Sequence, residues 1–517
     1  MVVALRKPKN PIPAHLRRSL AILRSVDDQQ REAKVVWRKR SFGTWGNLNP
    51  SYSLDDHGIR LRLRTETGIL SFRVAAVHWS RDGAEIIPIR VSGSSERPLL
   101  LRWREDEAGA SAPISPDDQR ECLISWMRLL LPDSKVLSIG DRCDRANSLS
   151  GSYFRIRARA PGRDFLILAA RSNCSPGQDF DSALSQALLW DAWLRRRRQL
   201  SGVPRMHLVV PADSAAILQH RSALLSPARV SIQIWQYDSS SSEHLSVESP
   251  SALEPPRENR EFRWPVLGPF QWSADLARVL DLAPSHIRRH PRFQEYDSLR
   301  LWGLEFATAR GEKRDCITFG VGPDKTELGE GNFEGLRILV DQILYFRRPD
   351  SPDPRHPLYR LQAERWLESL ILEDTPRLFP ELMPESVYSQ IPVYLGKDPG
   401  RVDILGADRE GTLVILELKV SPDPDLPIQA LDYWGRVVRH NQDGDFLRRG
   451  YFSGIPLNRR SPKLYLVSPV FSFHDSTEKL LGYFNRDLEV WKISINEDWR
   501  CGVRVLRRTR LQCGGDI

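Results

Sequence analysis

The sequence predicts an α/β protein with two domains, each a mixed central sheet flanked by helices and preceded by a small β-rich module. One observation is that residues 401–420, RVDILGADREGTLVILELKV, have the pattern of two strands joined by a tight turn. A second is that residues 153–171, YFRIRARAPGRDFLILAAR, can be aligned with 401–419 without a gap. Later segments repeat as well: SQALLWDAWL matches IQALDYWGRV, and MHLVVP from Met206 matches LYLVSP from Leu464.

The β-rich modules are predicted from alternating apolar and polar residues interrupted by glycines, as in IRLRLRTE and SLRLWGLEFATA. The clearest linker is SSSSEHLSVESPSALEPPRE, which is rich in serine, proline and charge. The predicted order is therefore a basic N-terminal segment, helical or loose (1–41), a β-rich module (42–112), a first mixed-sheet copy (113–238), a linker (239–260), a second β-rich module (261–355), a second mixed-sheet copy (356–510) and a tail (511–517).

The hairpin of the second copy brings charged residues together. A three-residue loop at 409–411, with Gly411 in the left-handed conformation, sets Asp408 against Thr412 and Asp403 near Glu417. Two carboxylates at cross-strand distance, about 5 Å, repel each other among apolar residues. The pair therefore predicts a divalent cation or a shared proton, with Lys419 on the same face as Glu417.

The order of these elements resembles the PD-(D/E)XK nuclease superfamily. Arg401-Val-Asp403 is followed by Glu417-Leu-Lys419 and then by Gln429 and Tyr433 four residues apart. Within that superfamily the order is most similar to the nuclease domain of NucS-type mismatch endonucleases, which carry R-x-D, E-x-K and Q-x-x-x-Y elements. Glu364, at the edge of an apolar helical stripe, matches the acidic residue of a preceding helix. The resemblance covers roughly residues 356–495.

The resemblance implies roles for these residues. It implies that Mg²⁺ or Mn²⁺ is held by Asp403, Glu417, the backbone carbonyl of Leu418 and Glu364. It also implies that Lys419 orients the attacking water or stabilises the transition state, while Gln429 and Tyr433 orient the catalytic strand or touch the substrate backbone. The residues expected to contact DNA are Arg401, Arg448, Arg449, Arg155 and Arg171.

The first copy lacks the central carboxylates. In the gapless alignment Arg155 falls on Asp403, Ala169 on Glu417 and Arg171 on Lys419. An arginine repels a divalent cation, so this copy is predicted to be catalytically inactive. Two alternatives remain open: it packs against the second copy, or its arginines hold DNA phosphate without cutting.

Composition supports a polyanion partner. The formal charge is +9 and the calculated isoelectric point is 9.3 over 517 residues, which suits a polyanion. The resemblance implies that this partner is double-stranded or structured DNA. The six cysteines form no C-x-x-C pair, which argues against a disulfide framework. With no apolar run of membrane-spanning length and no signal peptide visible, a cytoplasmic protein without a membrane partner is expected.

The predicted function is a metal-dependent DNA endonuclease in which the first copy is inactive and aids DNA binding or packing. The alternative is a non-catalytic nucleic-acid-binding or scaffold protein, in which Asp403, Lys419 and Glu417 form a structural salt-bridge network. A nuclease acting on RNA or on ends is a third reading. Repair, restriction and defence roles remain open, as do a homodimer and a pseudo-dimer formed by the two copies.

Overall fold

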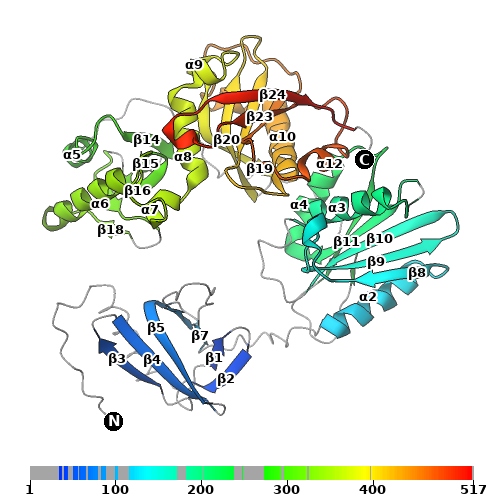
Figure 1. The fold of residues 1–517 in the computed structure, drawn as a ribbon. Helices are drawn as coiled ribbons and strands as arrows, with labels where there is room; N and C mark the ends of the chain where they lie inside the picture. Colours follow the sequence, from blue (N-terminus) through cyan, green and yellow to red (C-terminus); the bar gives the residue numbers. More distant parts are fainter. Residues whose placement is uncertain are drawn as a thin grey trace. The chain divides into compact units, whose positions relative to one another are not determined.

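A computed structural model of the chain divides into two compact units, residues 1–112 and 113–517, which are described separately (Figure 1). In the first unit the structure describes seven strands between residues 34 and 102, together with Pro50. In the second it describes residues 116–171, 182–237 except 201, 247–248, and 273–514 except 293–295, 312, 323–324 and 396–397. Most of the predicted N-terminal segment and linker lies outside these residues.

The first unit contains a seven-stranded antiparallel sheet in the order β2-β1-β7-β6-β5-β4-β3. The sheet begins at Lys34, inside the segment predicted to be helical or loose, because the apolar VVW sequence forms strand β1 against β2 and β7. The strands are β1 (Lys34–Trp37), β2 (Arg40–Thr44), β3 (Ser51–Asp55), β4 (Gly58–Thr65), β5 (Gly68–Trp79), β6 (Gly83–Pro88) and β7 (Leu99–Arg102).

The first α/β domain is built on a six-stranded sheet in the order β13-β12-β11-β10-β9-β8. Its two-residue strand β13 lies within the segment predicted to be a linker. The elements are α2 (Pro116–Leu130), β8 (Lys135–Gly140), η1 (Arg145–Asn147), β9 (Tyr153–Ala160), β10 (Arg163–Ala170), α3 (Ala183–Arg196), β11 (Arg205–Pro211), α4 (Ala212–Ala223), β12 (Ser231–Tyr237) and β13 (Val247–Glu248).

In the order of the chain, a five-stranded antiparallel sheet, β14 to β18 in sequence order, comes between the two α/β domains and has its own helices. Its apolar core joins α5 and α6 to β15 and β16. The elements are α5 (Ala274–Leu280), β14 (Ile287–Arg292), β15 (Tyr296–Leu301), β16 (Leu304–Arg310), β17 (Cys316–Phe319), β18 (Thr326–Glu327), η2 (Glu330–Asn332) and α6 (Phe333–Phe346).

The second α/β domain contains a six-stranded sheet in the order β19-β20-β21-β22-β23-β24. Helix α8 covers one face of the sheet and α10 the other, since apolar residues of β21 alternate between a core with α8 and a core with α10. The elements are α7 (Pro357–Arg360), α8 (Ala363–Glu373), α9 (Thr375–Leu378), η3 (Pro384–Ser386), β19 (Tyr388–Leu395), β20 (Asp398–Ala407), β21 (Leu413–Leu418), α10 (Leu426–Gln442), α11 (Asp445–Arg448), β22 (Lys463–Pro469), α12 (Thr477–Leu481), β23 (Val490–Ile495), η4 (Trp499–Cys501) and β24 (Val505–Leu511).

The two six-stranded sheets have the same strand directions. In each, the first three strands are antiparallel neighbours, the third to fifth are parallel neighbours, and the sixth is antiparallel to the fifth. The corresponding helices also follow the same strands: α3 and α10 follow the hairpin, and α4 and α12 follow the next strand. The mixed α/β architecture predicted from the sequence is therefore present in both regions.

The register of the two central hairpins differs by one residue, and this corrects the gapless alignment. The β9–β10 turn holds two residues, 161 and 162, so that Arg155 pairs with Leu168 rather than Ala169. In the adjacent strands Leu168 lies beside Leu208, just as Glu417 lies beside Leu466. Leu168 therefore takes the place of Glu417, and Ala170 takes the place of Lys419, because the first turn is one residue shorter.

The five-stranded module docks onto helix α8 of the second α/β domain. The β15–β16 turn approaches so closely that a Cβ on Gly303, whose φ is +75°, would lie 1.9 Å from the Arg365 carbonyl oxygen. The fully buried Arg347 donates to the carbonyls of Trp302, Leu358, Leu361 and Gln362, which links the turn to the start of α8. The N-terminal turn of α8 is thus fixed from outside its own domain.

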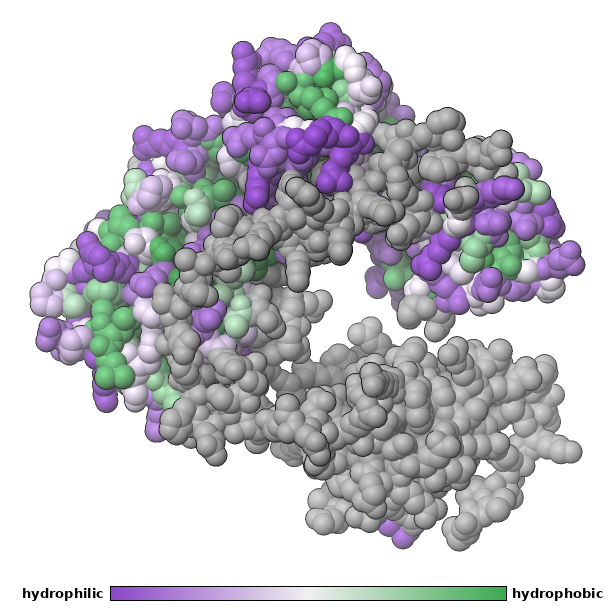
Figure 2. Space-filling view, turned by 180° about the vertical axis from the view of Figure 1, so that it is seen from behind, coloured by the Kyte–Doolittle hydropathy of each residue, from purple (hydrophilic) through white to green (hydrophobic). Residues whose placement is uncertain are grey.

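The described surface is mixed in polarity. On the face shown in Figure 2, hydrophilic side chains surround smaller hydrophobic patches. Among the residues that the structure describes, no helix combines the length and apolar character needed to cross a bilayer.

Candidate active site

The β20–β21 hairpin places Asp403 opposite Glu417. Ile404 pairs with Leu416, and the same register continued by one residue brings the two acids together across the strands. The turn has the predicted three residues: the Asp408 amide donates to the Thr412 carbonyl at 2.9 Å, and Gly411 has φ +78°. Glycine is required there, since a Cβ would lie 2.1 Å from the Pro456 carbonyl oxygen.

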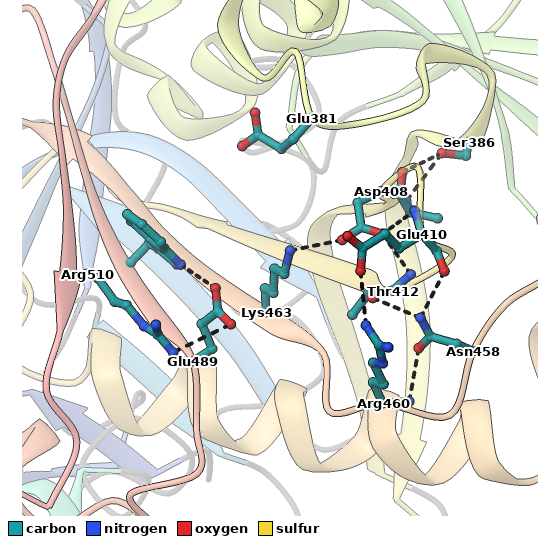
Figure 3. Close-up of polar contacts among 12 residues, drawn as sticks. Glu381, Ser386, Asp408, Glu410, Thr412, Asn458, Arg460, Lys463, Glu489 and Arg510 are labelled. Carbon is teal, nitrogen blue, oxygen red and sulfur yellow. Dashed lines mark hydrogen bonds and ion pairs between the residues drawn. The ribbon is translucent and has the colours of Figure 1, made fainter.

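Polar contacts hold this turn in place (Figure 3). One oxygen of the buried Asp408 carboxylate accepts hydrogen bonds from the Glu410 and Thr412 amides at 3.0 and 2.9 Å, and the other accepts one from the Lys463 ammonium at 2.9 Å. The Asn458 side chain donates to the Glu410 carbonyl and the Thr412 hydroxyl, as Figure 3 shows. Because the turn is tied on both sides, the register that brings Asp403 to Glu417 is fixed.

Glu417 is an acid held among apolar residues. Val414, Leu416 and Leu418 enter the core beneath α8, and alternation turns Glu417 to the face of Leu413 and Ile415 beneath α10. Only 2% of Glu417 is exposed, and its Oε2 atom has no hydrogen-bond partner. Burial, reinforced by the charge of Asp403, raises the pKa of Glu417 well above its usual range.

Asp403 has more partners than Glu417. Its Oδ2 atom accepts a hydrogen bond from the Leu418 amide at 3.0 Å, and its Oδ1 atom accepts bonds from Arg365 at 3.2 Å and Gln390 at 3.1 Å. Burial raises the pKa of Asp403, while Arg365 and the Leu418 amide act in the opposite direction. Asp403 and Glu417 thus face each other, and the hydrogen bonds just described compensate the charge of Asp403 alone.

Helix α8 brings a second acid that the sequence reasoning missed. Glu364, the predicted residue, lies in its first turn, is half-buried, and its charge acts on Asp403, Glu417 and Lys419. Glu368, one turn further, is 2% exposed, and burial raises its pKa to about 7. The sequence could have indicated Glu368, because it follows Glu364 by four residues and residues at that spacing share a helix face.

Two polar side chains join Glu368 to Asp403. Arg365 donates to Glu368 at 2.8 Å as well as to Asp403, and Gln390 donates to Glu368 at 3.0 Å. Gln390 has φ +56°, and it lies opposite Asp403 at a position where the β19–β20 pairing is interrupted without a change of register. Such a conformation costs free energy in a residue other than glycine, so the contacts on both sides must hold it.

Lys419 lies directly after β21. Its amide donates to the Val467 carbonyl at 3.0 Å, which continues the pairing with β22. Its ammonium group contacts Asp423 at 3.2 Å. Burial alone lowers the pKa of Lys419, but the charges of Asp423, Glu364 and Glu417 outweigh it and raise the pKa above its ordinary value. Lys419 is therefore a fixed ammonium ion beside the acids.

Helix α10 supplies Gln429 and Tyr433, the predicted pair. The Gln429 amide donates to the Tyr433 hydroxyl at 3.3 Å. Burial, with the charge of Glu417 adding to it, raises the pKa of Tyr433 to about 12. Tyr433 is thus protonated at neutral pH, with its hydroxyl in the electrostatic field of Glu417.

The predicted DNA-contacting arginines lie in four different settings. Arg401 is half-buried on β20, two residues before Asp403, and Arg448 and Arg449 lie at the end of α11, where Arg448 pairs with Asp445. Arg155 is 7% exposed and donates to the Ser150 and Arg142 carbonyls, so it lacks the open face that a phosphate contact needs. Arg171 pairs with Asp141 and stacks on Phe154.

The acids fit a divalent cation through the uncompensated pair. Among the described residues no three His, Cys, Asp or Glu side chains converge as a ready-made ligand set. Magnesium, however, is commonly bound through only one or two carboxylates together with waters and substrate phosphates. The Oε2 atom of Glu417 is buried opposite Asp403 and has no hydrogen-bond partner. A bound cation would supply the interaction that this oxygen lacks.

No protein-family model matches the chain, and no curated protein is similar to it. The solved structures that are similar to parts of it include the following two. A repair endonuclease from Pyrococcus abyssi is 25% identical over 26% of this chain and 46% of its own, with a TM-score of 0.14. An EndoMS complex with double-stranded DNA is 18% identical over 40% of this chain and 64% of its own, with a TM-score of 0.16. The chain thus spans less than two thirds of either.

Proposed function

We propose that the chain is a metal-dependent endonuclease that hydrolyses phosphodiester bonds in DNA. The observation that carries the proposal is the buried pair of Asp403 and Glu417, with a bare Glu417 oxygen and the Lys419 ammonium at the end of the same strand. A buried pair of like charges is costly unless a cation or proton compensates it. Pairs arranged in this way are typical of functional sites rather than of packing.

In this proposal Asp403, Glu417 and the Leu418 carbonyl hold Mg²⁺ or Mn²⁺, and Glu364 completes the set directly or through water. When bound, the ion lowers the pKa of a water molecule and neutralises charge on the phosphate. Arg365 and Gln390 orient Asp403 through its Oδ1 atom. The Leu418 amide holds the other oxygen.

Lys419 supplies positive charge where the phosphate becomes more negative in the transition state. The Lys419 ammonium group is held beside the acids by its contact with Asp423, and not by a direct ion pair with Glu417. Gln429 and Tyr433 present neutral hydrogen-bond donors from α10 toward the strand. With the calculated isoelectric point of 9.3, these groups suit a polyanionic substrate.

One contact favours the alternative of a non-catalytic nucleic-acid-binding protein. Arg365 bridges Asp403 and Glu368, and this ion pair would compensate the acids without any metal. The two proposals differ in what happens on adding a divalent cation. Only the nuclease needs one for its function.

A cleavage assay tests the proposal. Plasmid, single-stranded DNA, mismatched duplex and RNA are each incubated with Mg²⁺, Mn²⁺ or EDTA. Asp403→Asn and Glu417→Gln should reduce cleavage by roughly 10²-fold or more while leaving DNA binding intact or tighter, since a carboxylate facing phosphate is removed.

Glu410→Gln is the matched control. Its carboxylate belongs to the turn of the same hairpin, is exposed, and pairs with Arg460 on the surface. This variant should cleave like the wild type. Full activity of Asp403→Asn, or cleavage that persists in EDTA, would refute the metal site.

A further inference from the structure

The two α/β domains meet through equivalent residues. Ser182 and Asp425 are the residues that cap α3 and α10, the helices that follow the two central hairpins. The Ser182 hydroxyl donates to the Asp425 carboxylate at 2.5 Å. In a symmetric dimer, only residues at the two-fold axis meet their own counterparts.

A second pair of equivalent segments also meets. The chain following α4 forms an antiparallel bridge with the chain following α12, at Leu225 and Phe484. The Ser226 amide donates to the Tyr483 carbonyl at 2.9 Å. Helices α4 and α12 occupy the same place in the two sheets, so this contact also joins like to like.

Elsewhere in the interface, the segment that follows a helix of one domain contacts a helix of the other domain. Tyr483, just after α12, donates its hydroxyl to the Leu188 carbonyl of α3 at 3.1 Å. In the reciprocal contact Leu224, just after α4, packs against α10 so closely that a Cβ on Gly435 would lie 2.6 Å from it. Exchange of this kind is the pattern of an isologous interface, in which one contact occurs twice.

Both exchanged contacts bury an aspartate on the hairpin-following helix. Asp191 of α3 accepts from Arg195 and Tyr483, and Asp432 of α10 accepts from Arg436 and Arg221. A single apolar core runs through the interface and includes residues of both sheets. The first α/β domain therefore supports α10 from the side opposite the carboxylate pair.

The interface is symmetric, but the chemistry is not. At the places of Asp403, Glu417 and Lys419 the first domain holds Arg155, Leu168 and Ala170. The Arg155 guanidinium is buried and bonded to backbone carbonyls, and burial lowers its pKa. These three residues offer no ligand to a cation, so one of the two related positions is closed to hydrolysis.

We infer that the first α/β domain takes the place of the second subunit of a symmetric dimer, and that the chain therefore cuts one strand of duplex DNA per binding event. This inference rests on the proposed nuclease function. The two strands of a duplex run in opposite directions, so a two-fold pair of centres cuts both, whereas one centre hydrolyses one phosphodiester. The product is a nick with its partner strand intact.

A supercoiled plasmid distinguishes the outcomes, with the full chain, Mg²⁺ or Mn²⁺, and DNA in molar excess. We expect open circles to accumulate first and linear DNA to appear only after them. Linear DNA as the first product would overturn the inference and leave the nuclease function standing. No cleavage with either metal would overturn the nuclease function and the inference with it.

A mixing experiment tests whether two chains act together. Wild-type chain is assayed at fixed concentration with increasing amounts of Asp403→Asn, with DNA still in excess. If each chain is complete, the rate of nicking per wild-type chain stays unchanged. If two chains form the cutting unit, the mixture loses linear product in favour of nicked product, and the inference fails.

Discussion

The two α/β domains have the same strand order and directions, yet bury opposite charges at the centre of the hairpin. The second holds Asp403 and Glu417, two buried acids whose pKa values burial raises, so that a cation or a proton must compensate their charge. The first holds Arg155, whose charge is met by two backbone carbonyls. In the second domain the buried charge is thus not fully compensated by the protein, whereas in the first domain backbone carbonyls compensate it.

The comparison separates the elements that form the interface from the residues that carry the buried charges. Both domains use their hairpin-following helix and the chain beyond the next helix for the shared interface. The residues at the hairpin centre are not among those that make these polar contacts. The two hairpins differ by one residue in the turn, and Arg155 and Leu168 stand at the places of the acids Asp403 and Glu417.

The largest expected effect is on Lys419. Lys419→Met should lower turnover by about 10²- to 10³-fold with little change in metal affinity, because an ammonium group acts on the transition state and is not a ligand. The matched control is Lys463→Met, since Lys463 pairs with Asp408 at the other end of the hairpin. That variant should lose thermal stability but keep its turnover per folded molecule. Equal turnover in both variants would reduce Lys419 to a salt-bridge partner.

An intermediate effect is expected in the pH dependence of stability. Burial raises the pKa of Glu368 to about 7 from an ordinary 4.5, so the folded state binds its proton more tightly than the unfolded state does. The stabilisation is complete below pH 4.5 and is lost as pH rises toward and through 7. In EDTA, melting temperature should therefore fall over this range for the wild type and fall less for Glu368→Gln.

The exposed Glu410→Gln serves as control in these melts and should follow the wild type. Added Mg²⁺ or Mn²⁺ should raise the wild-type melting temperature at pH 7 and above, because the cation binds only the folded protein. That increase should be absent in Glu417→Gln. Parallel melting curves for wild type and Glu368→Gln at every pH would show that Glu368 does not titrate in this range.

The smallest expected effect concerns the first domain. Arg155→Met removes bonds to two buried carbonyls and should destabilise the protein by about 1–3 kcal/mol. DNA affinity and its salt dependence should stay as in the wild type. If the slope of log affinity against log salt concentration instead falls by about 0.9, one phosphate contact has been lost and Arg155 binds DNA.

Local rules predicted the hairpin correctly in the second domain. Gly411 fixed the turn, and the turn length fixed which residue faces Asp403. The same reasoning placed Ala169 instead of Leu168 opposite Arg155 in the first domain. The turns differ by one residue, and a gapless alignment cannot represent that difference. Because the side-chain period of a strand is two, the shift of one residue replaces Ala169 by a neighbour on the other face.

The sequence by itself determined the elements, their order and the acids on one hairpin, because strand alternation, helix spacing and turn chemistry act over a few residues. Tertiary structure alone decided that Glu368 and Gln390 join Asp403 and that the Glu417 oxygen has no partner. It also decided that Ser182 meets Asp425, far apart in the chain. Burial and long-range contact depend on how whole elements pack, and no local pattern encodes them.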